Sequence, residues 1–459
     1  MGLNLNLVEV VQAVWPSKPV DKQFEQQPLS TIQVTGITTD TREIQPGYVF
    51  VALRGQTYDG HSFVEAAAAE GAAAAIVDQD LPPQSVPLLR VPDTLMAYQA
   101  LGHWWRERLG LSIVAVTGSV GKTTTKELIA AALATQGRVG KTRANYNNEI
   151  GVPKTLLEFT PDHRFGVVEM GMRGAGEIAL LARIARPDIA VITNVGTAHI
   201  GRLGSEQAIA DAKCELLAEL APNGIAILNH DCSRLISTAA GVWSGRVITY
   251  GLEGGDVQGR LIDDQTIDVE GIRLPLPLPG QHNALNYLAA VAVMKALGLD
   301  WTQLQTGLMV NLPAGRTRQI ELPGDIVLLD ETYNAGLESM LAALELLAKL
   351  PGKRRLAVLG TMKELGDHSI RLHRQVGEQV KHLGIDGLFI LADPDAAEAM
   401  VTGASSVPIQ QFDDHDRLIR ALQEELQPGD RLLLKASRSV ALDRVVAGLQ
   451  AAPQDVRDM

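Results

Sequence analysis

The chain has 459 residues, of which 46% are hydrophobic and 20% charged, so it is too long for one ordinary domain and too apolar to be disordered. The net charge of −12 argues against a protein that wraps nucleic acid, because phosphate contacts require clustered lysine and arginine. The N-terminus lacks a basic signal-peptide start and no stretch approaches the roughly 20 apolar residues of a transmembrane helix, which predicts a soluble, cytoplasmic protein without a membrane partner.

Residues 1–108 mix short strands with helices. The segments Ile32–Val34 and Tyr48–Leu53 predict strands, because β-branched and aromatic residues dominate them. The segment Ser62–Glu70 predicts a helix, and the alanine-rich segment Ala72–Val77 predicts a buried strand. We therefore expect a small α/β domain at the start of the chain.

From Leu111 onward, buried strands alternate with helical sequence, which is typical of a parallel α/β sheet. The expected strands are Ser112–Val116, Gly166–Met170, Ile189–Thr193 and Gly224–Leu228. The stretch 243–279 has short alternating runs and predicts a small antiparallel insertion, after which a helix over Ala284–Leu297 closes the region. This pattern predicts a central parallel-sheet domain over residues 109–313.

The segment Leu312–Arg316 is predicted to be a linker, and the strand Ile326–Asp330 then opens a third α/β unit. Its later strands are expected at 355–359, 387–391 and 431–435. The prediction is thus three α/β domains, over 1–108, 109–313 and 314–459, the last of them Rossmann-like.

The segment Thr-Gly-Ser-Val-Gly-Lys-Thr-Thr follows a predicted strand and opens a helix predicted over Lys122–Ala134, as a phosphate-binding loop must. Its glycines let backbone N–H groups turn toward phosphate oxygens, and the helix N-terminus adds positive potential. Lys122 can reach the outer phosphates and the Thr123 hydroxyl can bind Mg²⁺. Position 116 is Val where the general loop has glycine, so this loop is a shorter variant. The expected nucleotide-binding residues are Thr117, Gly118, Ser119, Val120, Gly121, Lys122, Thr123 and Thr124.

The shortened loop and further segments along the chain resemble the Mur ligase and folylpolyglutamate synthetase superfamily. The matching segments are Asn145–Pro153, Val168–Gly171, Asn194–His199, Pro279–Asn283 and Leu329–Ala335. The segments Thr39–Arg42, Pro46–Gly47, Phe50–Leu53 and Asp59–Phe63 resemble the nucleotide-sugar domain of Mur ligases. Two late segments, Leu359–Gly366 and Lys435–Ser439, resemble the branch that adds D-alanyl-D-alanine. Single segments are weak signals, but their order and spacing together are specific.

This resemblance implies an ATP-dependent ligase, with ATP and Mg²⁺ as cofactors, that joins D-alanyl-D-alanine to UDP-N-acetylmuramoyl-tripeptide in peptidoglycan synthesis. It implies an acyl phosphate formed from the γ-phosphate of ATP, and a monomeric protein. Phosphoryl transfer is catalysed mainly by positioning and charge neutralisation, so metal ions are expected between ATP and the acceptor carboxylate. Whether the third residue of the acceptor peptide is diaminopimelate or lysine stays open.

The resemblance also assigns expected roles in catalysis. Glu169, at a strand end, is a hard oxygen ligand suited to Mg²⁺, and His199 is the expected second ligand. Lys213 matches a lysine that several Mur ligases carry as a carbamate, whereas the sequence alone also allows an ordinary surface lysine. The expected catalytic residues are Lys122, Glu169, His199, Lys213 and Arg316, and the expected metal ligands are Thr123, Glu169, His199 and Lys213.

Other residues are expected to contact the nucleotide and the acceptor. Asn283 is placed near the adenine or ribose, and Arg316 on the γ-phosphate after a domain motion that brings it from an open form. The chain has Glu331, preceded by Asp330, where the family has aspartate beside the ribose, so either carboxylate fits; Gly336 replaces the usual asparagine. The expected acceptor contacts are Thr39, Asp40, Thr41, Arg42, Asp59, His61, Asn145, Asn147 and Asn148.

Three alternatives compete with this interpretation. The diaminopimelate- or lysine-adding Mur ligase shares the N-terminal domain but usually carries an Asn-Pro-Arg motif, which the third domain lacks. A folylpolyglutamate synthetase lacks the nucleotide-sugar domain. A phosphate-loop NTPase switch would need a second nucleotide-sensing loop and no third domain with its own nucleotide contacts.

Overall fold

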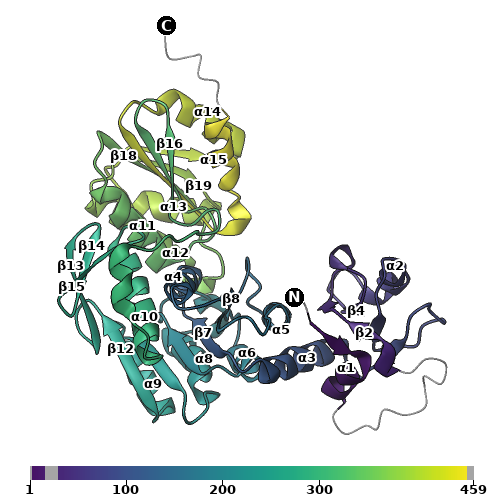
Figure 1. Ribbon diagram of the computed structural model, residues 1–459. Helices are drawn as coiled ribbons and strands as arrows, with labels where there is room; N and C mark the ends of the chain where they lie inside the picture. The colour runs from purple at the N-terminus through teal and green to yellow at the C-terminus, as the bar shows by residue number, and fades with distance from the viewer. Residues whose placement is uncertain (1–2, 16–28, 452–459) are drawn as a thin grey trace.

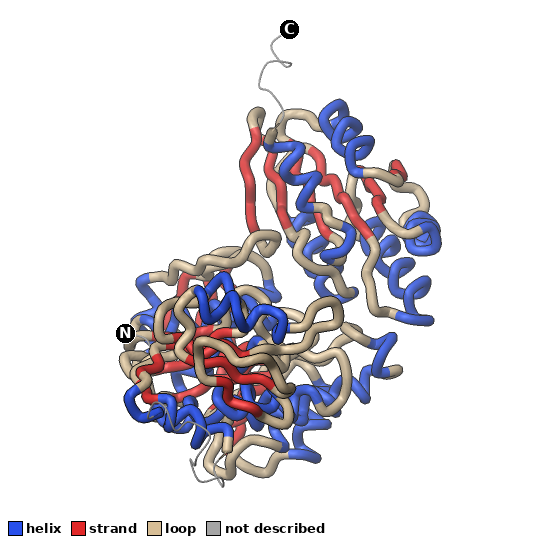
Figure 2. Tube along the Cα trace, turned by 90° about the vertical axis from the view of Figure 1, so that its right-hand side faces the viewer, coloured by secondary structure: helices blue, strands red, loops and turns tan. Residues whose placement is uncertain are grey.

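The computed structural model describes residues 3–15 and 29–451, and within them the strands form four sheets. Three units lie in an arc, with the first and last sheets at opposite ends and the largest sheet between them (Figure 1). Figure 2 shows the C-terminal unit standing apart from the other two in a second view. The predicted α/β class is confirmed, while the boundaries at 108 and 313 stay predictions. No helix in the described ranges combines the length and the apolar composition that crossing a bilayer requires.

The N-terminal unit is a four-stranded parallel sheet beside a two-stranded ladder. Its strands are β1 Leu5–Asn6, β2 Gln33–Val34, β3 Gly36–Thr38, β4 Tyr48–Val51, β5 Ala74–Val77 and β6 Leu88–Arg90. Its helices are α1 Leu7–Val14 and α2 Val64–Ala69, the latter entered through a 3₁₀ turn, Gly60–Phe63. The predicted strands over 48–53 and 72–77 are confirmed with shorter ends, because alanine and valine there are fully buried in the sheet.

The middle unit is a nine-stranded sheet in the order β15-β14-β13-β12-β11-β10-β7-β9-β8. Its strands are β7 Ser112–Thr117, β8 Val139–Lys141, β9 Phe165–Glu169, β10 Ile189–Ile192, β11 Ile225–Asn229, β12 Arg246–Gly251, β13 Val257–Asp263, β14 Thr266–Val269 and β15 Ile272–Pro275. The prediction of an antiparallel insertion over 243–279 is wrong at its start. Strand β12 pairs in parallel with β11, and the antiparallel pairing begins only between β13 and β14.

Helices cover both faces of this sheet, as the buried strands require. They are α3 Thr94–Leu109, α4 Lys122–Ala134, α5 Gly151–Leu157, α6 Glu177–Ala185, α7 Ile200–Leu203, α8 Glu206–Ala218, α9 Ser233–Val242 and α10 Gln281–Ala296. Helix α4 has the predicted bounds, and α10 begins three residues earlier than predicted, at Gln281.

The C-terminal unit is a six-stranded sheet in the order β16-β17-β21-β18-β19-β20. Its elements are β16 Arg318–Leu322, β17 Ile326–Asp330, α11 Leu337–Lys349, β18 Arg354–Gly360, α12 Ser369–His382, β19 Gly387–Leu391, α13 Pro394–Gly403, β20 Ile409–Phe412, α14 His415–Glu425, β21 Asp430–Lys435 and α15 Asp443–Gln450. The predicted strands are confirmed. Strand β16 was not predicted; it pairs antiparallel with β17 at the sheet edge.

The order of the middle sheet creates a topological switch point at the carboxyl end of β7. Strand β7 lies between β10 and β9. The strands that follow β7 in the sequence are therefore added to the sheet on both sides of it. Open parallel sheets bind ligands outside the carboxyl ends of strands at such a point. The turns after β7, β9 and β10 therefore share one edge, and these turns carry the predicted phosphate loop, Glu169 and the 193–199 segment.

Candidate active site

The phosphate loop follows β7 and has two glycines that no other residue could replace. Gly118 has φ 152°, and a Cβ there would lie 1.9 Å from the Thr193 hydroxyl oxygen. Gly121 begins α4 with φ 84°, and its Cβ would lie 2.6 Å from Asn286 Oδ1. The Thr125 hydroxyl donates to the same Asn286 oxygen at 3.1 Å. The loop is thus a close-fitting turn packed between β10 and α10.

The segment that follows β10 holds the loop in place. Asn194 Oδ1 accepts the Val120 amide at 2.9 Å, and the Asn194 carbonyl accepts the Ser119 amide at 3.1 Å. The Thr193 hydroxyl donates to the Val120 carbonyl at 2.7 Å, and the Gly196 amide donates to Ser119 Oγ at 2.9 Å. The conformation of the loop therefore depends on the 193–196 segment.

Lys122 folds back over the loop. Its ammonium group donates to the carbonyls of Gly118 at 2.8 Å and Ser119 at 3.3 Å. Burial lowers the pKa of Lys122, the nearby Glu169 carboxylate opposes this, and Arg316 lowers the pKa further. A bound phosphate would therefore stabilise the charged form of this buried ammonium group, as expected for a phosphate site.

Glu169 ends β9 and is 2% exposed. Its Oε1 accepts the Asn147 side-chain amide at 2.7 Å, while its buried Oε2 accepts no hydrogen bond from the described residues. The ammonium group of Lys126, which is fully buried, lies 3.7 Å from Oε2 and 3.0 Å from Glu127 Oε1. A buried carboxylate oxygen without a donor fits a hard cation, because buried charges are otherwise paired or bound to metal.

His199 lies at the start of α7, where Glu364 of the C-terminal unit meets it. Glu364 Oε2 is 2.5 Å from His199 Nδ1, and both residues have left-handed backbone, with φ 67° and 63°. Burial and the Lys122 charge lower the pKa of His199, opposed in part by Glu364. A neutral imidazole whose Nδ1 is held by a carboxylate leaves Nε2 for another partner, which is the usual arrangement of a metal-binding histidine.

Lys213, on α8, is 1% exposed. Its ammonium group makes no hydrogen bond or ion pair within the part of the chain that the structure describes. Burial and Lys122 lower the pKa of Lys213 well below its usual value, and Cys214 and Glu338 oppose them. The surface-lysine alternative is therefore wrong: Lys213 is a buried amine.

Arg316 belongs structurally to the C-terminal unit. Its guanidinium carbon lies 3.9 Å from the centre of the Tyr333 ring, and its Nε is buried without an acceptor in the described residues. The flanking Gly315 carbonyl accepts the Tyr333 amide at 3.0 Å, and the Thr317 amide and hydroxyl both donate to Glu331 at 3.0 Å. Its charge already acts on Lys122. The expected open form, with Arg316 too far from the loop to touch a bound nucleotide, stays a prediction.

The two candidate ribose carboxylates have different surroundings. Asp330 is 4% exposed and accepts the Thr332 hydroxyl at 2.7 Å. Glu331 faces Lys435, whose ammonium group is 3.3 Å away. Burial raises the pKa of Glu331, but Lys435, His282 and the Thr317 hydrogen bond outweigh it and lower that pKa overall. Glu331 is thus the carboxylate directed toward the start of α10.

Asn283 is buried in the first turn of α10 and donates to the Pro279 carbonyl at 2.7 Å. A cavity of about 250 Å³ lies beside it, between the start of α10 and helix α11. Its lining residues are Gly280, Gln281, His282, Leu285, Ala342, Glu345, Leu346 and Lys349. Asn283 therefore lies near this cavity, but its side-chain amide already donates a hydrogen bond to the Pro279 carbonyl.

The expected acceptor contacts divide between the first two units. Asp40 pairs with Arg42, whose guanidinium Nη2 is 2.6 Å away and 87% exposed. Asp59 accepts the His61 amide at 3.0 Å and lies 2.6 Å from His61 Nδ1, which fixes the turn before α2.

The remaining expected contacts lie near α5. Asn145 is exposed, and Asn148 accepts the Gly151 amide at 2.9 Å at the start of the helix. Asn147 instead touches Glu169, so its visible role is to orient that carboxylate. The substrate roles of this set stay predictions.

Several residues of the site were not predicted. They are Lys126, Thr193, Asn194, Glu338, Tyr333 and Glu364. The Asn-x-x-x-x-His spacing could have indicated Asn194, since both ends of that segment now have partners. Glu338 and Glu364 had no local signal, because their contacts join residues 141 and 165 positions apart.

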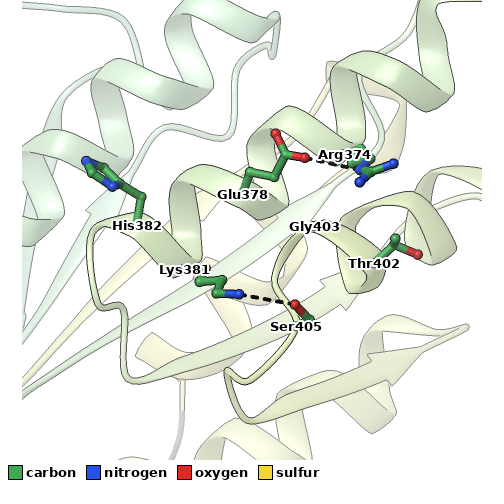
Figure 3. Close-up of a pocket in the computed structure, with 7 residues that line it drawn as sticks. All are labelled: Arg374, Glu378, Lys381, His382, Thr402, Gly403 and Ser405. Atoms are coloured by element: carbon green, nitrogen blue, oxygen red, sulfur yellow. Dashed lines mark hydrogen bonds and ion pairs between the residues drawn. The ribbon is translucent and has the colours of Figure 1, made fainter.

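A larger surface hollow, of about 360 Å³, lies between α12 and α13 and contains no predicted site residue. Figure 3 shows its rim, where Arg374 pairs with Glu378 and Lys381 with Ser405. Its cations are already partnered or exposed, so we place no chemistry there.

Known proteins share this arrangement. Residues 33–101 match the Mur ligase family catalytic domain, residues 116–294 the Mur ligase middle domain, and residues 315–438 the Mur ligase glutamate ligase domain. The chain is 58% identical to a UDP-N-acetylmuramoyl-tripeptide–D-alanyl-D-alanine ligase from Synechocystis sp., over 92% of this chain and 93% of that one.

Solved structures agree with these matches. A MurF crystal structure from Acinetobacter baumannii superposes with a TM-score of 0.87 at 31% identity, covering 98% of this chain and 99% of that one. MurF ligase from Thermotoga maritima in complex with ADP superposes with a TM-score of 0.81 at 30% identity, covering 90% and 97%.

Proposed function

The chain belongs to the Mur ligase family, and we propose that it joins D-alanyl-D-alanine to UDP-N-acetylmuramoyl-tripeptide with hydrolysis of ATP to ADP and phosphate. The observation that carries this proposal is the 58% identity, over 92% of the chain, to a ligase of that name. The site at the end of β7 supports it, because it combines a phosphate loop with buried cations and a buried carboxylate oxygen that accepts no hydrogen bond from the described residues. The product is a peptidoglycan precursor, and we place the reaction in the cytoplasm, where ATP is available.

The reaction divides into two steps. An oxygen of the acceptor carboxylate attacks the γ-phosphorus, the bond to ADP breaks, and an acyl phosphate forms. The amine of D-alanyl-D-alanine then attacks the acyl carbon, phosphate leaves, and the amine loses a proton. Lys122 lies in the phosphate loop and Arg316 belongs to the C-terminal unit, and we propose that together they neutralise the transferred phosphoryl group.

Mg²⁺ fits the donors that the site at the end of β7 offers. Among the described residues no three His, Cys, Asp or Glu side chains gather into a metal-holding group, so a binding set needs other oxygens. We propose Thr123, Glu169, His199 and a carbamate on Lys213 as that set, with the Glu169 oxygen that lacks a donor as the main observation. When bound, Mg²⁺ supplies positive charge that neutralises the phosphate oxygens and the acceptor carboxylate.

Lys213 has the properties that carbamate formation needs. A neutral amine attacks the carbon of CO₂ and releases one proton, and burial favours the neutral amine here. We predict that Lys213→Ala is inactive and is partly rescued by acetate, whereas Lys295→Ala, in the last turn of α10, behaves like the wild type. A ¹³C resonance from labelled CO₂ that disappears in Lys213→Ala would support the modification, and full activity of Lys213→Ala would refute it.

We place the nucleotide and the acceptor on the remaining residues. The phosphates lie on Thr117–Thr124, the ribose meets Glu331 rather than Asp330, and the adenine occupies the cavity of about 250 Å³ beside Asn283. The acceptor contacts Thr39–Arg42, Asp59, His61 and Asn145–Asn148. The charge of Glu331 acts on His282, which lines that cavity, and this supports the ribose assignment.

The decisive assay measures ADP release with purified protein and ATP. We expect ADP only when both D-alanyl-D-alanine and UDP-N-acetylmuramoyl-tripeptide are present, and a product whose mass equals their sum less one water. Diaminopimelate or lysine with the corresponding dipeptide acceptor, and folate with glutamate, test the related ligases. Product from either of those mixtures, or ADP release without any acceptor, would overturn the assignment.

A further inference from the structure

The 193–199 segment faces two ways. One face binds the phosphate loop, through Asn194 to Ser119 and Val120 and through the Gly196 amide to Ser119 Oγ. The other face meets the C-terminal unit. Any residue that fixes the second face therefore influences the loop that holds the phosphates.

Glu338 is the residue of the C-terminal unit that reaches this face. It is the second residue of α11, and its Oε1 accepts the Thr197 amide at 2.6 Å. The Thr197 hydroxyl lies 3.3 Å from its Oε2 and donates to it. Thr197 is only 5% exposed and Glu338 is half-buried, and hydrogen bonds to charged groups are the stronger kind.

Gly196 shows how closely the carboxylate fits. A Cβ on Gly196 would lie 2.5 Å from the carboxyl carbon of Glu338, so the carboxylate occupies the space that a side chain would need. The adjacent amide of Gly196 is the one that binds Ser119. One carboxylate from the C-terminal unit thus lies one peptide away from the hydrogen bond that holds the phosphate loop.

We infer that Glu338 is a positioning residue: by capturing Thr197 it fixes the 193–197 segment, and so the phosphate loop, when the C-terminal unit meets the middle unit. The inference rests on the proposed ligation. Glu338 makes no hydrogen bond to the loop or to the expected metal ligands in the described structure. Its charge also acts on Lys213, so the contact with Thr197 is the route that the experiments must isolate. Positioning is the main source of rate in phosphoryl transfer, which is why a residue of this kind can matter.

Steady-state kinetics of Glu338→Ala and Glu338→Gln test this role. Loss of a hydrogen bond to a charged group predicts a fall in kcat of roughly 10- to 100-fold for Glu338→Ala. The KM for ATP should change by less than about threefold, because the loop itself keeps its backbone amides and Lys122. Glu338→Gln should retain part of the rate, because its amide oxygen still accepts from Thr197. The control is Glu321→Gln, an exposed carboxylate on β16 of the same unit, which should match the wild type.

A double-mutant cycle with Ser119→Ala tests the route. If Glu338 acts through Gly196 and Ser119, Glu338→Ala should cost much less in a Ser119→Ala background than in the wild type. Additive losses would overturn the inference, as would wild-type kcat in Glu338→Ala or a loss seen only in the KM for ATP.

Small-angle scattering gives a readout that does not depend on turnover. Glu338→Ala should have a larger radius of gyration than Glu321→Gln at an unchanged thermal midpoint, because one tie between the units is lost. Equal radii would count against the inference. A wild-type protein that forms no amide product would instead refute the proposed function, while the scattering comparison would still decide whether Glu338 joins the units.

Discussion

On its N-terminal side the middle unit shares a buried helix with its neighbour, whereas on its C-terminal side separate elements of the two units meet through apolar and polar contacts. Helix α3 packs Leu101 into the N-terminal core and, in its next turn, donates from Trp105 Nε1 to the Phe159 carbonyl at 2.9 Å. Arg106 adds hydrogen bonds to the Ala185 carbonyl and Asp188. The Lys154–Glu43 ion pair joins the same two units at the surface.

At the C-terminal junction, buried residues of both units, among them Ile200 and Leu365, belong to one hydrophobic cluster. Polar contacts add to it: Glu338 binds Thr197, Glu364 meets His199 and Arg202, and the Gly201 amide donates to the Glu364 carbonyl at 3.0 Å. The linker before it includes Gly315, with φ 75°. Interfaces between domains usually permit relative motion. We therefore expect the N-terminal unit to be held rigidly through α3, and the unit carrying Arg316 to move relative to the phosphate loop.

The largest expected effect on the rate belongs to Lys122, which lies in the middle unit between the two junctions. Lys122→Ala should lower kcat by roughly a thousandfold, since a buried cation aimed at transferred charge is lost. Its fold should be unchanged, because the ammonium group binds only loop carbonyls. Turnover with a circular dichroism check measures both, with Lys295→Ala as control. A folded Lys122→Ala protein with ordinary ATP consumption would show that the site at the end of β7 does not bind the phosphates.

Glu169→Gln should come next, with a fall in kcat of about a hundredfold and a higher Mg²⁺ requirement, because a metal-binding charge is removed at nearly constant volume. The substitution should also lower the pKa of Lys122, because the Glu169 charge raises that pKa against the effect of burial. A Mg²⁺ titration of the rate measures the effect, and Glu253→Gln, an exposed carboxylate of the same unit, is the matched control. Unchanged Mg²⁺ dependence would remove Glu169 from the ligand set.

The phosphate loop and strand β16 show which elements the sequence could predict and which it could not. The β7–loop–α4 unit was predicted with α4 at its observed bounds, because a buried strand, a glycine turn and a helix start are all local signals. Strand β16 was missed because its sequence, Arg-Gln-Ile-Glu-Leu, is half polar and becomes a strand only by pairing with β17.

Side chains that act across units were harder to predict. Glu338 has its contact only because folding brings the start of α11 against the loop after β10. Tyr333 meets Arg316 within the C-terminal unit, through the folding of the linker onto the end of β17. Likewise, Asn147 was expected to touch substrate, and only the packed structure shows it holding Glu169. Local patterns thus predicted the loop, whereas assembly determines what positions it.

Tyr333 gives a smaller test on the C-terminal junction. Its ring supports the Arg316 guanidinium, so Tyr333→Leu should lower kcat by about tenfold through loss of a cation–π contact and freer motion of the arginine. Tyr333→Phe keeps the ring and should stay near the wild-type rate. Steady-state turnover of both variants decides it. Equal losses in the two variants would assign the effect to the hydroxyl and not to the support of Arg316.

The smallest expected effect belongs to the N-terminal junction and concerns stability instead of rate. Trp105→Phe keeps an aromatic ring but removes the donor to the Phe159 carbonyl, which should lower the free energy of unfolding by about 1 kcal/mol. Because the lost hydrogen bond ties α3 to the middle unit far from the phosphate loop, kcat should change by less than about twofold.

Urea unfolding and turnover of Trp105→Phe measure the two quantities. Trp104→Phe makes the same change one residue earlier, at a half-buried ring stacked under Arg108, and should cost less stability. If Trp105→Phe instead lowered kcat while stability held, the N-terminal junction would also have to move during turnover. The contrast between a fixed N-terminal unit and a mobile C-terminal unit would then be wrong, because both neighbours of the middle unit would take part in closure.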